Sequence, residues 1–138
     1  MIIKCLRSST ELRLSEDEGL RKSDGSESYL VTIKGENLDA SLKVYAFDPM
    51  NKGLDRFLNK IAEQWRGWKN EEKWRSLEGE FALVCKHDGV GHIDIEATLY
   101  SPGSWTVRNT FHVVAGELDQ IASDAKRFFD FGKTPFIT

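Results

Sequence analysis

The spacing of apolar residues changes three times along this chain, and these changes constrain its fold more than any other feature of the sequence. Apolar and polar residues alternate in several stretches before residue 48 and again between residues 79 and 114, which is the pattern of β-strands with one wet face. Between these regions, and again after residue 115, apolar residues recur at the spacing of an amphipathic helix. The sequence therefore predicts an α+β fold, a mostly antiparallel sheet of about seven strands with two amphipathic helices packed on one face.

Seven stretches have the composition of strands and are separated by turns. They cover residues 1–7, 10–15, 28–35, 38–47, 79–87, 91–101 and 105–114. The turns at residues 35–37 and 87–91 contain glycine or asparagine, which tolerate the positive φ angles of tight turns. The polar segment 16–27 shows no period and is predicted to be an exposed loop. All 138 residues are assigned to a single domain.

Two stretches with helical spacing have recognisable ends. The first predicted helix begins with Asp48 as its N-cap and Pro49 in its first turn, and Gly67 ends it. Its apolar stripe consists of Leu54, Phe57, Leu58, Ile61, Ala62 and Trp65. The second predicted helix spans residues 116–131 and ends near Gly132. Its stripe consists of Leu118, Ile121, Ala122, Ala125 and either Phe128 or Phe129.

Three of the four tryptophans lie within ten positions of one another, at the end of the first predicted helix. Trp65 continues the apolar stripe and is predicted to lie in the core. Trp68 and Trp74 flank a charged turn, where each ring can cover an edge of the sheet while its N–H stays near water or a carbonyl group. The alternative is that these two rings, with Arg66 and Arg75 beside them, are interface hot spots.

The balance of charge limits the classes of partner. The chain has 19 Lys and Arg residues against 22 Asp and Glu residues, which gives a net charge of −3 and a pI near 5.6. Proteins that bind nucleic acid concentrate positive charge, so we expect no nucleic-acid partner, whereas a basic protein partner is compatible with this balance. No apolar run approaches the ~18 residues needed to span a bilayer, and no membrane association is predicted.

Both cysteines, Cys5 and Cys85, lie in apolar stretches. The simplest interpretation is two buried free thiols in a reducing cytoplasm, and a disulfide between neighbouring strands is the alternative. Residues 1–14 hold one apolar pair followed by charges, which is not the pattern of a signal peptide. The sequence therefore predicts a cytoplasmic protein.

One polar segment has the residue types of a metal or acid–base site. Its imidazoles and carboxylates are His87, Asp88, His92, Asp94 and Glu96. A metal-dependent enzyme would use His87, His92 and Asp94 together with His112 from the next strand. Successive residues on one face of a strand tend to diverge, however, so a solvated strand face is the alternative interpretation.

Glu78 and Glu80 are a second candidate acid–base pair, but nothing in the sequence indicates a pocket around them. Neither Cys5 nor Cys85 has an activating neighbour, and no phosphate-binding glycine loop opens a helix. The sequence therefore predicts no catalytic residue, no metal and no cofactor, and we expect that the chain is not an enzyme.

Several ordered motifs resemble those of a family of small bacterial proteins of unassigned function. They are W-R-G-W at residues 65–68, K-W-R-S-L-E-G-E at 73–80, G-H-I-D-I-E at 91–96 and A-G-E-L-D-Q-I-A at 115–122. The resemblance covers about residues 28–131. More distantly, the chain is similar to the WapI-like immunity proteins of polymorphic toxins, which share the strand–helix–strand order, a Gly-His-Ile strand and a Leu-rich C-terminal helix.

The WapI-like resemblance implies neutralisation of a toxin domain by tight binding without catalysis. We therefore expect an immunity or antitoxin-like protein that occludes its partner, and a basic toxin domain as that partner. The residues predicted to contact it are Glu16, Asp17, Glu18, Asp24, Glu27, Trp68, Trp74, Asp94 and Glu96. The alternative is a small-ligand-binding domain or a self-assembling accessory domain, for which a concave apolar cavity would be the sign. The sequence makes no prediction about oligomeric state.

Overall fold

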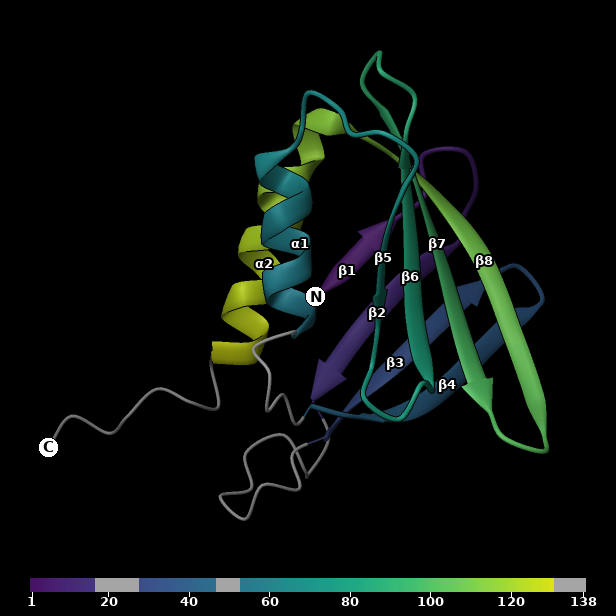
Figure 1. The fold of residues 1–138 in the computed structure, drawn as a ribbon. Helices are drawn as coiled ribbons and strands as arrows, with labels where there is room; N and C mark the ends of the chain where they lie inside the picture. Colours follow the sequence, from purple (N-terminus) through teal and green to yellow (C-terminus); the bar gives the residue numbers. More distant parts are fainter. Residues whose placement is uncertain (17–27, 47–52, 131–138) are drawn as a thin grey trace, which may run out of the picture.

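The computed structural model describes residues 1–16, 28–46 and 53–130, which form two four-stranded antiparallel sheets and two α-helices (Figure 1). The first sheet has the order β1-β2-β3-β4, and its strands are β1 (Ile2–Lys4), β2 (Glu11–Glu16), β3 (Ser28–Gly35) and β4 (Leu38–Tyr45). The second sheet has the order β5-β6-β7-β8, and its strands are β5 (Glu71–Arg75), β6 (Phe81–His87), β7 (His92–Ser101) and β8 (Trp105–Val114).

The predicted α+β class and antiparallel pairing are confirmed, but the prediction of seven strands in one sheet is wrong. The additional strand is β5, which the sequence suggested was a charged turn. Its alternation is between exposed charges and the half-buried Glu72 and Trp74, with no aliphatic residue, so it lacks the apolar signal that marked the other strands. The division into two sheets was missed because alternation shows which residues share a face, and not which strands pair.

The predicted tight turns are present. Asn37 has a φ of 58° in the two-residue connection between β3 and β4. Gly89 and Gly91 have φ values of 83° and 96° in the turn between β6 and β7. These left-handed conformations fix the register of both hairpins.

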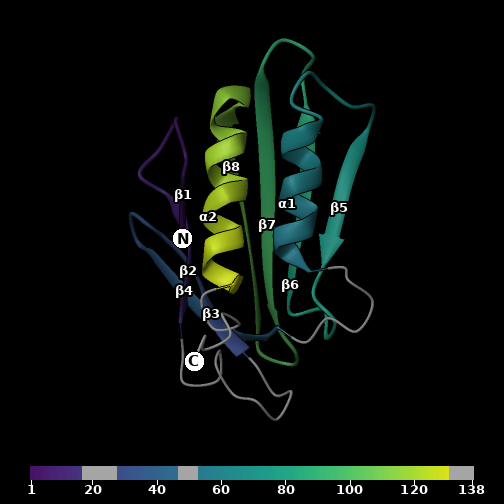
Figure 2. The ribbon, with the colours of Figure 1, turned by 90° about the vertical axis from the view of Figure 1, so that its left-hand side faces the viewer.

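The two helices, α1 (Leu54–Glu63) and α2 (Leu118–Asp130), lie side by side over the sheets, as Figure 2 shows. A short 3-10 turn, Ala115–Glu117, leads into α2. The predicted stripes are buried except at Trp65, and of the two phenylalanines in α2 it is Phe129 that is buried. None of the helices in the described ranges is long and apolar enough to cross a membrane.

The start of α1 differs from the prediction. Gly53 has an extended conformation, with φ −65° and ψ 160°, so α1 begins at Leu54. Asp48 and Pro49, as well as Gly132 and Pro135 at the predicted end of the second helix, lie outside the described residues.

A single apolar core lies between the sheets and the helices. The strands of the two sheets run obliquely to each other (Figure 1), and the sheets are joined by the main chain where the Leu6 N–H donates to the His112 carbonyl oxygen at 2.9 Å. The helices pack against the sheets. On the first sheet, Tyr29 packs edge-on against Phe129 of α2, with ring centroids 5.1 Å apart.

Candidate functional site

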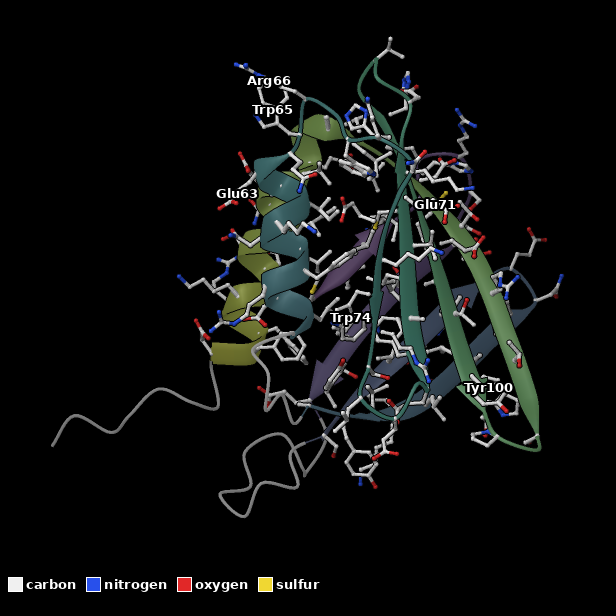
Figure 3. The ribbon with its side chains drawn as sticks, viewed as in Figure 1. Glu63, Trp65, Arg66, Glu71, Trp74 and Tyr100 are labelled. Atoms are coloured by element: carbon white, nitrogen blue, oxygen red, sulfur yellow. The ribbon has the colours of Figure 1, made fainter. Side chains whose placement is uncertain are left out.

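The segment that follows α1 forms an exposed corner, Trp65–Gly67, at one end of the molecule. Trp65 lies beyond the end of the helix and is 51% exposed, and the guanidinium carbon of Arg66 lies 5.1 Å from the centroid of its ring (Figure 3). The prediction that Trp65 lies in the core is therefore wrong. The stripe extends to position 65 only if the helix does, and α1 ends at Glu63.

The corner is fixed to the second sheet by His87, the last residue of β6. The Nδ1 atom of His87 accepts a hydrogen bond from the Gly89 N–H at 2.8 Å, so the ring proton is on Nε2, which donates to the Trp65 carbonyl oxygen at 2.8 Å. Gly67 packs directly on this ring, because a Cβ atom at that position would lie 3.5 Å from Nδ1. The main chain of the corner is thus held in place while the indole of Trp65 stays in solvent.

Trp68 and Trp74 have the packing role that was one of their two interpretations. The Trp68 Nε1–H donates to the Cys85 carbonyl oxygen at 3.1 Å, and its ring lies edge-on to His87 with centroids 5.0 Å apart. Trp74 packs edge-on against Phe81 at 5.4 Å. Both rings are partly buried against the core, and a contact role for either one stays a prediction.

Asp94 and Glu96 lie together on the outer face of the second sheet, as expected from alternation, and each has a cationic or imidazole partner on β8. Asp94 Oδ1 lies 2.5 Å from Nδ1 of His112, its cross-strand neighbour. Glu96 Oε1 lies 3.7 Å from Nε of Arg108. Both carboxylates that were predicted to steer a basic partner toward this face therefore have a neighbour on β8.

Glu71 of β5 extends this pattern across the sheet. It lies 3.3 Å from Lys86 and 3.5 Å from Lys73. Its hydrogen bond to Lys86, foremost, lowers the pKa of this carboxyl. The outer face is therefore a mosaic of paired charges.

The candidate metal ligands do not converge. Asp88 caps its own turn: its carboxylate accepts the N–H groups of His92 and Val90 and lies 2.7 Å from Nδ1 of His92. These hydrogen bonds, with that of the His92 N–H first, lower the pKa of Asp88 to about 2. Within residues 1–16, 28–46 and 53–130, no group of three or more His, Cys, Asp or Glu side chains could hold a metal ion.

The two glutamates of the S-L-E-G-E motif have different surroundings. Glu80 is buried and accepts a hydrogen bond from the Ser76 hydroxyl, whereas Glu78 is exposed. The motif forms the turn between β5 and β6, in which Gly79 has a φ of 78°. Arg75 lies so close to Gly79 that a Cβ atom there would be 2.7 Å from its guanidinium. The motif is thus a structural turn.

Cys5 and Cys85 are both free and buried, as the simpler interpretation had it. Burial, and after it the Glu72 carboxylate, raises the pKa of the Cys85 thiol to about 12. Burial also raises the pKa of Cys5, but hydrogen bonds, first from the His112 N–H, outweigh it and leave this pKa below the ordinary value.

The five described residues among those predicted to contact a partner do not share one surface. Trp68 and Trp74 pack toward the core, Asp94 and Glu96 lie on the outer sheet face, and Glu16 ends β2 in the first sheet. The other four, Asp17, Glu18, Asp24 and Glu27, lie outside the described residues. The exposed tryptophan at position 65 was missed, although the nearby Gly67 was already expected to end the helix.

Comparison with known proteins identifies a family but no activity. The model of a family described as a family of unknown function (DUF6228) matches residues 4–132. No curated protein and no solved structure matches the chain. Because the match covers nearly the whole sequence, the chain belongs to this family of unknown function, DUF6228.

Proposed function

We propose that this chain is a non-enzymatic protein-binding module that acts in the manner of an immunity protein, by covering the working surface of a partner toxin domain. The observation that carries the proposal is the half-exposed Trp65 with Arg66 beside its ring, on a main chain held by His87. Tryptophan and arginine dominate the hot spots of protein interfaces. A main chain that is already ordered loses less entropy when a partner binds.

The polar residues that suggested chemistry have structural roles that support a binding function. Both nitrogens of His87 are in hydrogen bonds, and Asp88 holds its own turn. The net charge of −3 favours a basic partner, and the free state of both cysteines is in keeping with a reducing cytoplasm. We call the exposed corner Trp65–Gly67 the tryptophan corner. In this proposal the tryptophan corner supplies the binding energy and the paired carboxylates of the outer face contribute little.

Affinity purification with Trp65→Ala tests this function. We expect the tagged chain to recover one stoichiometric basic protein from a lysate of its source, and Trp65→Ala to lose it because the anchor is removed. The substitution should change the free energy of unfolding by no more than about 1 kcal/mol, since the indole lies outside the core. The recovered protein should arrest growth when it is expressed alone. Co-expression of the chain should relieve that arrest.

Leu77→Ala is the matched control. Leu77 is 61% exposed in the turn at the other end of β5, so its loss removes apolar surface away from the corner. Recovery of the partner should survive this change. A partner that is kept by Trp65→Ala and lost by Leu77→Ala would refute the assignment of the corner, and recovery of the chain alone would refute a stable protein partner.

A further inference from the structure

A second surface lies along the free edge of β5, beside α1. We call it the edge groove; its lining residues are Gly53, Arg56, Phe57, Lys60, Lys73, Trp74 and Arg75, and its volume is about 330 Å³. Two elements build it. Arg56 and Lys60 are one turn apart on α1, and Trp74 points from β5 toward that helix (Figure 3).

The edge groove is positively charged in a chain whose net charge is negative. Four of its seven lining residues are Arg or Lys and none is Asp or Glu. Lys60 lies 2.9 Å from Glu72, and Lys73 lies 3.5 Å from Glu71. Within the described ranges, neither Arg56 nor Arg75 forms an ion pair.

The main chain of β5 has a free edge along the edge groove. β5 pairs with β6 on one side, and no described strand pairs with its other side. Along it, Lys73 and Arg75 lie on the outer face of the sheet, while Trp74 and α1 lie on the inner face. A strand added at this edge would alternate its side chains between Lys73 and Arg75 on one side and Arg56 and Lys60 on the other.

We infer that the edge groove binds an extended acidic segment of a partner protein, which adds to β5 as a fifth strand of the second sheet. Main-chain hydrogen bonds supply affinity in this mode of recognition, and the side chains supply specificity. Here the cations on both faces of the edge select carboxylates. Basic residues also occur on edge strands merely to discourage pairing, and that role predicts no binding of such a segment.

Peptide binding distinguishes these roles. The probe is a short fluorescent peptide in which Glu alternates with Thr and Val, compared by anisotropy with the same peptide carrying Lys in place of Glu. We expect saturable binding of the Glu peptide, weakened by salt, and none of the Lys peptide. Binding of neither peptide, or of both equally, would overturn the inference, and tighter binding of an oligothymidine would assign the groove to nucleic acid instead.

Two further measurements locate the contact. Arg56→Glu should weaken binding of the Glu peptide by about tenfold or more, because it reverses an unpaired charge in the groove. Lys126→Glu makes the same charge change on the exposed face of α2 and should have an effect of less than about twofold. Equal losses in the two variants would show a general charge effect and refute the groove.

Backbone methylation tests the added strand itself. N-methyl groups on alternate residues remove the amide donors from one edge of the peptide, so only one of the two methylated registers should lose binding. Equal binding of both registers would refute strand addition. Trp65→Ala should leave peptide binding unchanged, so the edge groove and the tryptophan corner can fail independently.

Discussion

Ser76 stabilises the turn between β5 and β6 through its hydrogen bonds. Its hydroxyl donates to the Glu80 carboxylate and accepts the Phe81 N–H at 3.1 Å, while its own N–H donates to the Phe81 carbonyl oxygen at 2.8 Å. Ser76 is 5% exposed and Glu80 is 9% exposed, so water cannot easily replace these bonds. The turn between β5 and β6 therefore depends on a buried polar contact.

Substitution of this serine should be costly. In Ser76→Ala the Glu80 carboxylate and the Phe81 N–H both lose a buried partner, and we expect the free energy of unfolding to fall by about 1–3 kcal/mol. Urea unfolding followed by circular dichroism measures the change. Ser123→Ala, on the exposed face of α2, is the control and should stay within about 0.5 kcal/mol of the wild type. Equal effects of the two substitutions would contradict the role of Ser76.

The two thiols should differ in reactivity. Cys5 is 8% exposed and its pKa lies below the ordinary 9.0, whereas Cys85 is fully buried and its pKa is raised to about 12. In native protein, iodoacetamide should modify Cys5 first, with a rate that reaches half its maximum below pH 9, because the thiolate is the reactive form. Mass spectrometry should find Cys85 modified only after unfolding in urea. Native Cys5→Ser should stay unmodified, and its rapid labelling would contradict this assignment.

At the scale of elements, the hairpin of β6 and β7 is closed by Asp88. This carboxylate receives the N–H groups of His92 at 3.0 Å and Val90 at 2.8 Å. The same turn positions His87, whose ring supports the tryptophan corner. Loosening the turn would therefore loosen the candidate site.

Acid should loosen this turn over a defined range of pH. The pKa of Asp88 falls from an ordinary 3.8 to about 2 in the folded chain, so its charged form favours folding. This contribution is fully present above about pH 4 and is lost as the pH falls through about 2. Carbon-13 NMR titration of the carboxyl group should give a midpoint near 2. A midpoint at the ordinary value would show that the two N–H groups do not hold the charge.

The helices were more accessible to sequence reasoning than the strands. The stripes of α1 and α2 repeat over several turns, so five of six predicted positions in α1 are buried. The ends of the helices were less predictable. α1 begins only after the extended Gly53, and it ends before Trp65. Strand β5 was not predicted, because Glu71, Lys73 and Arg75 face solvent at an edge and carry no apolar signal.

At the scale of the whole molecule, one core joins two sheets that the sequence did not separate. The pairing of strands depends on contacts far apart in the chain, such as that of Leu6 with His112, and no local pattern reports them. Which tryptophan is exposed was unpredictable for the same reason. Trp68 and Trp74 are partly buried because β6 places Cys85 and Phe81 beside them, whereas Trp65 lies beyond the end of α1.

The shared core predicts one cooperative unfolding transition. Ile33 in the first sheet and Ile95 in the second are both fully buried, and Ile33→Val and Ile95→Val should each cost about 0.5–1.5 kcal/mol. The tryptophans lie in the second sheet or in the segment leading to it, so their fluorescence reports on that part. Both variants should shift the fluorescence and circular dichroism midpoints together. A fluorescence midpoint unchanged by Ile33→Val would show that the sheets unfold separately.

The hydrogen bond from His87 to the tryptophan corner has an evolutionary consequence. It holds position 65 by its carbonyl oxygen, an atom that every amino acid possesses, and leaves the side chain outside the core. Substitution at this position changes what the corner presents while the turn, the helix end and the hairpin keep their places. If the corner binds a partner as proposed, a lineage built on this frame can exchange one partner for another by few mutations, without first having to refold.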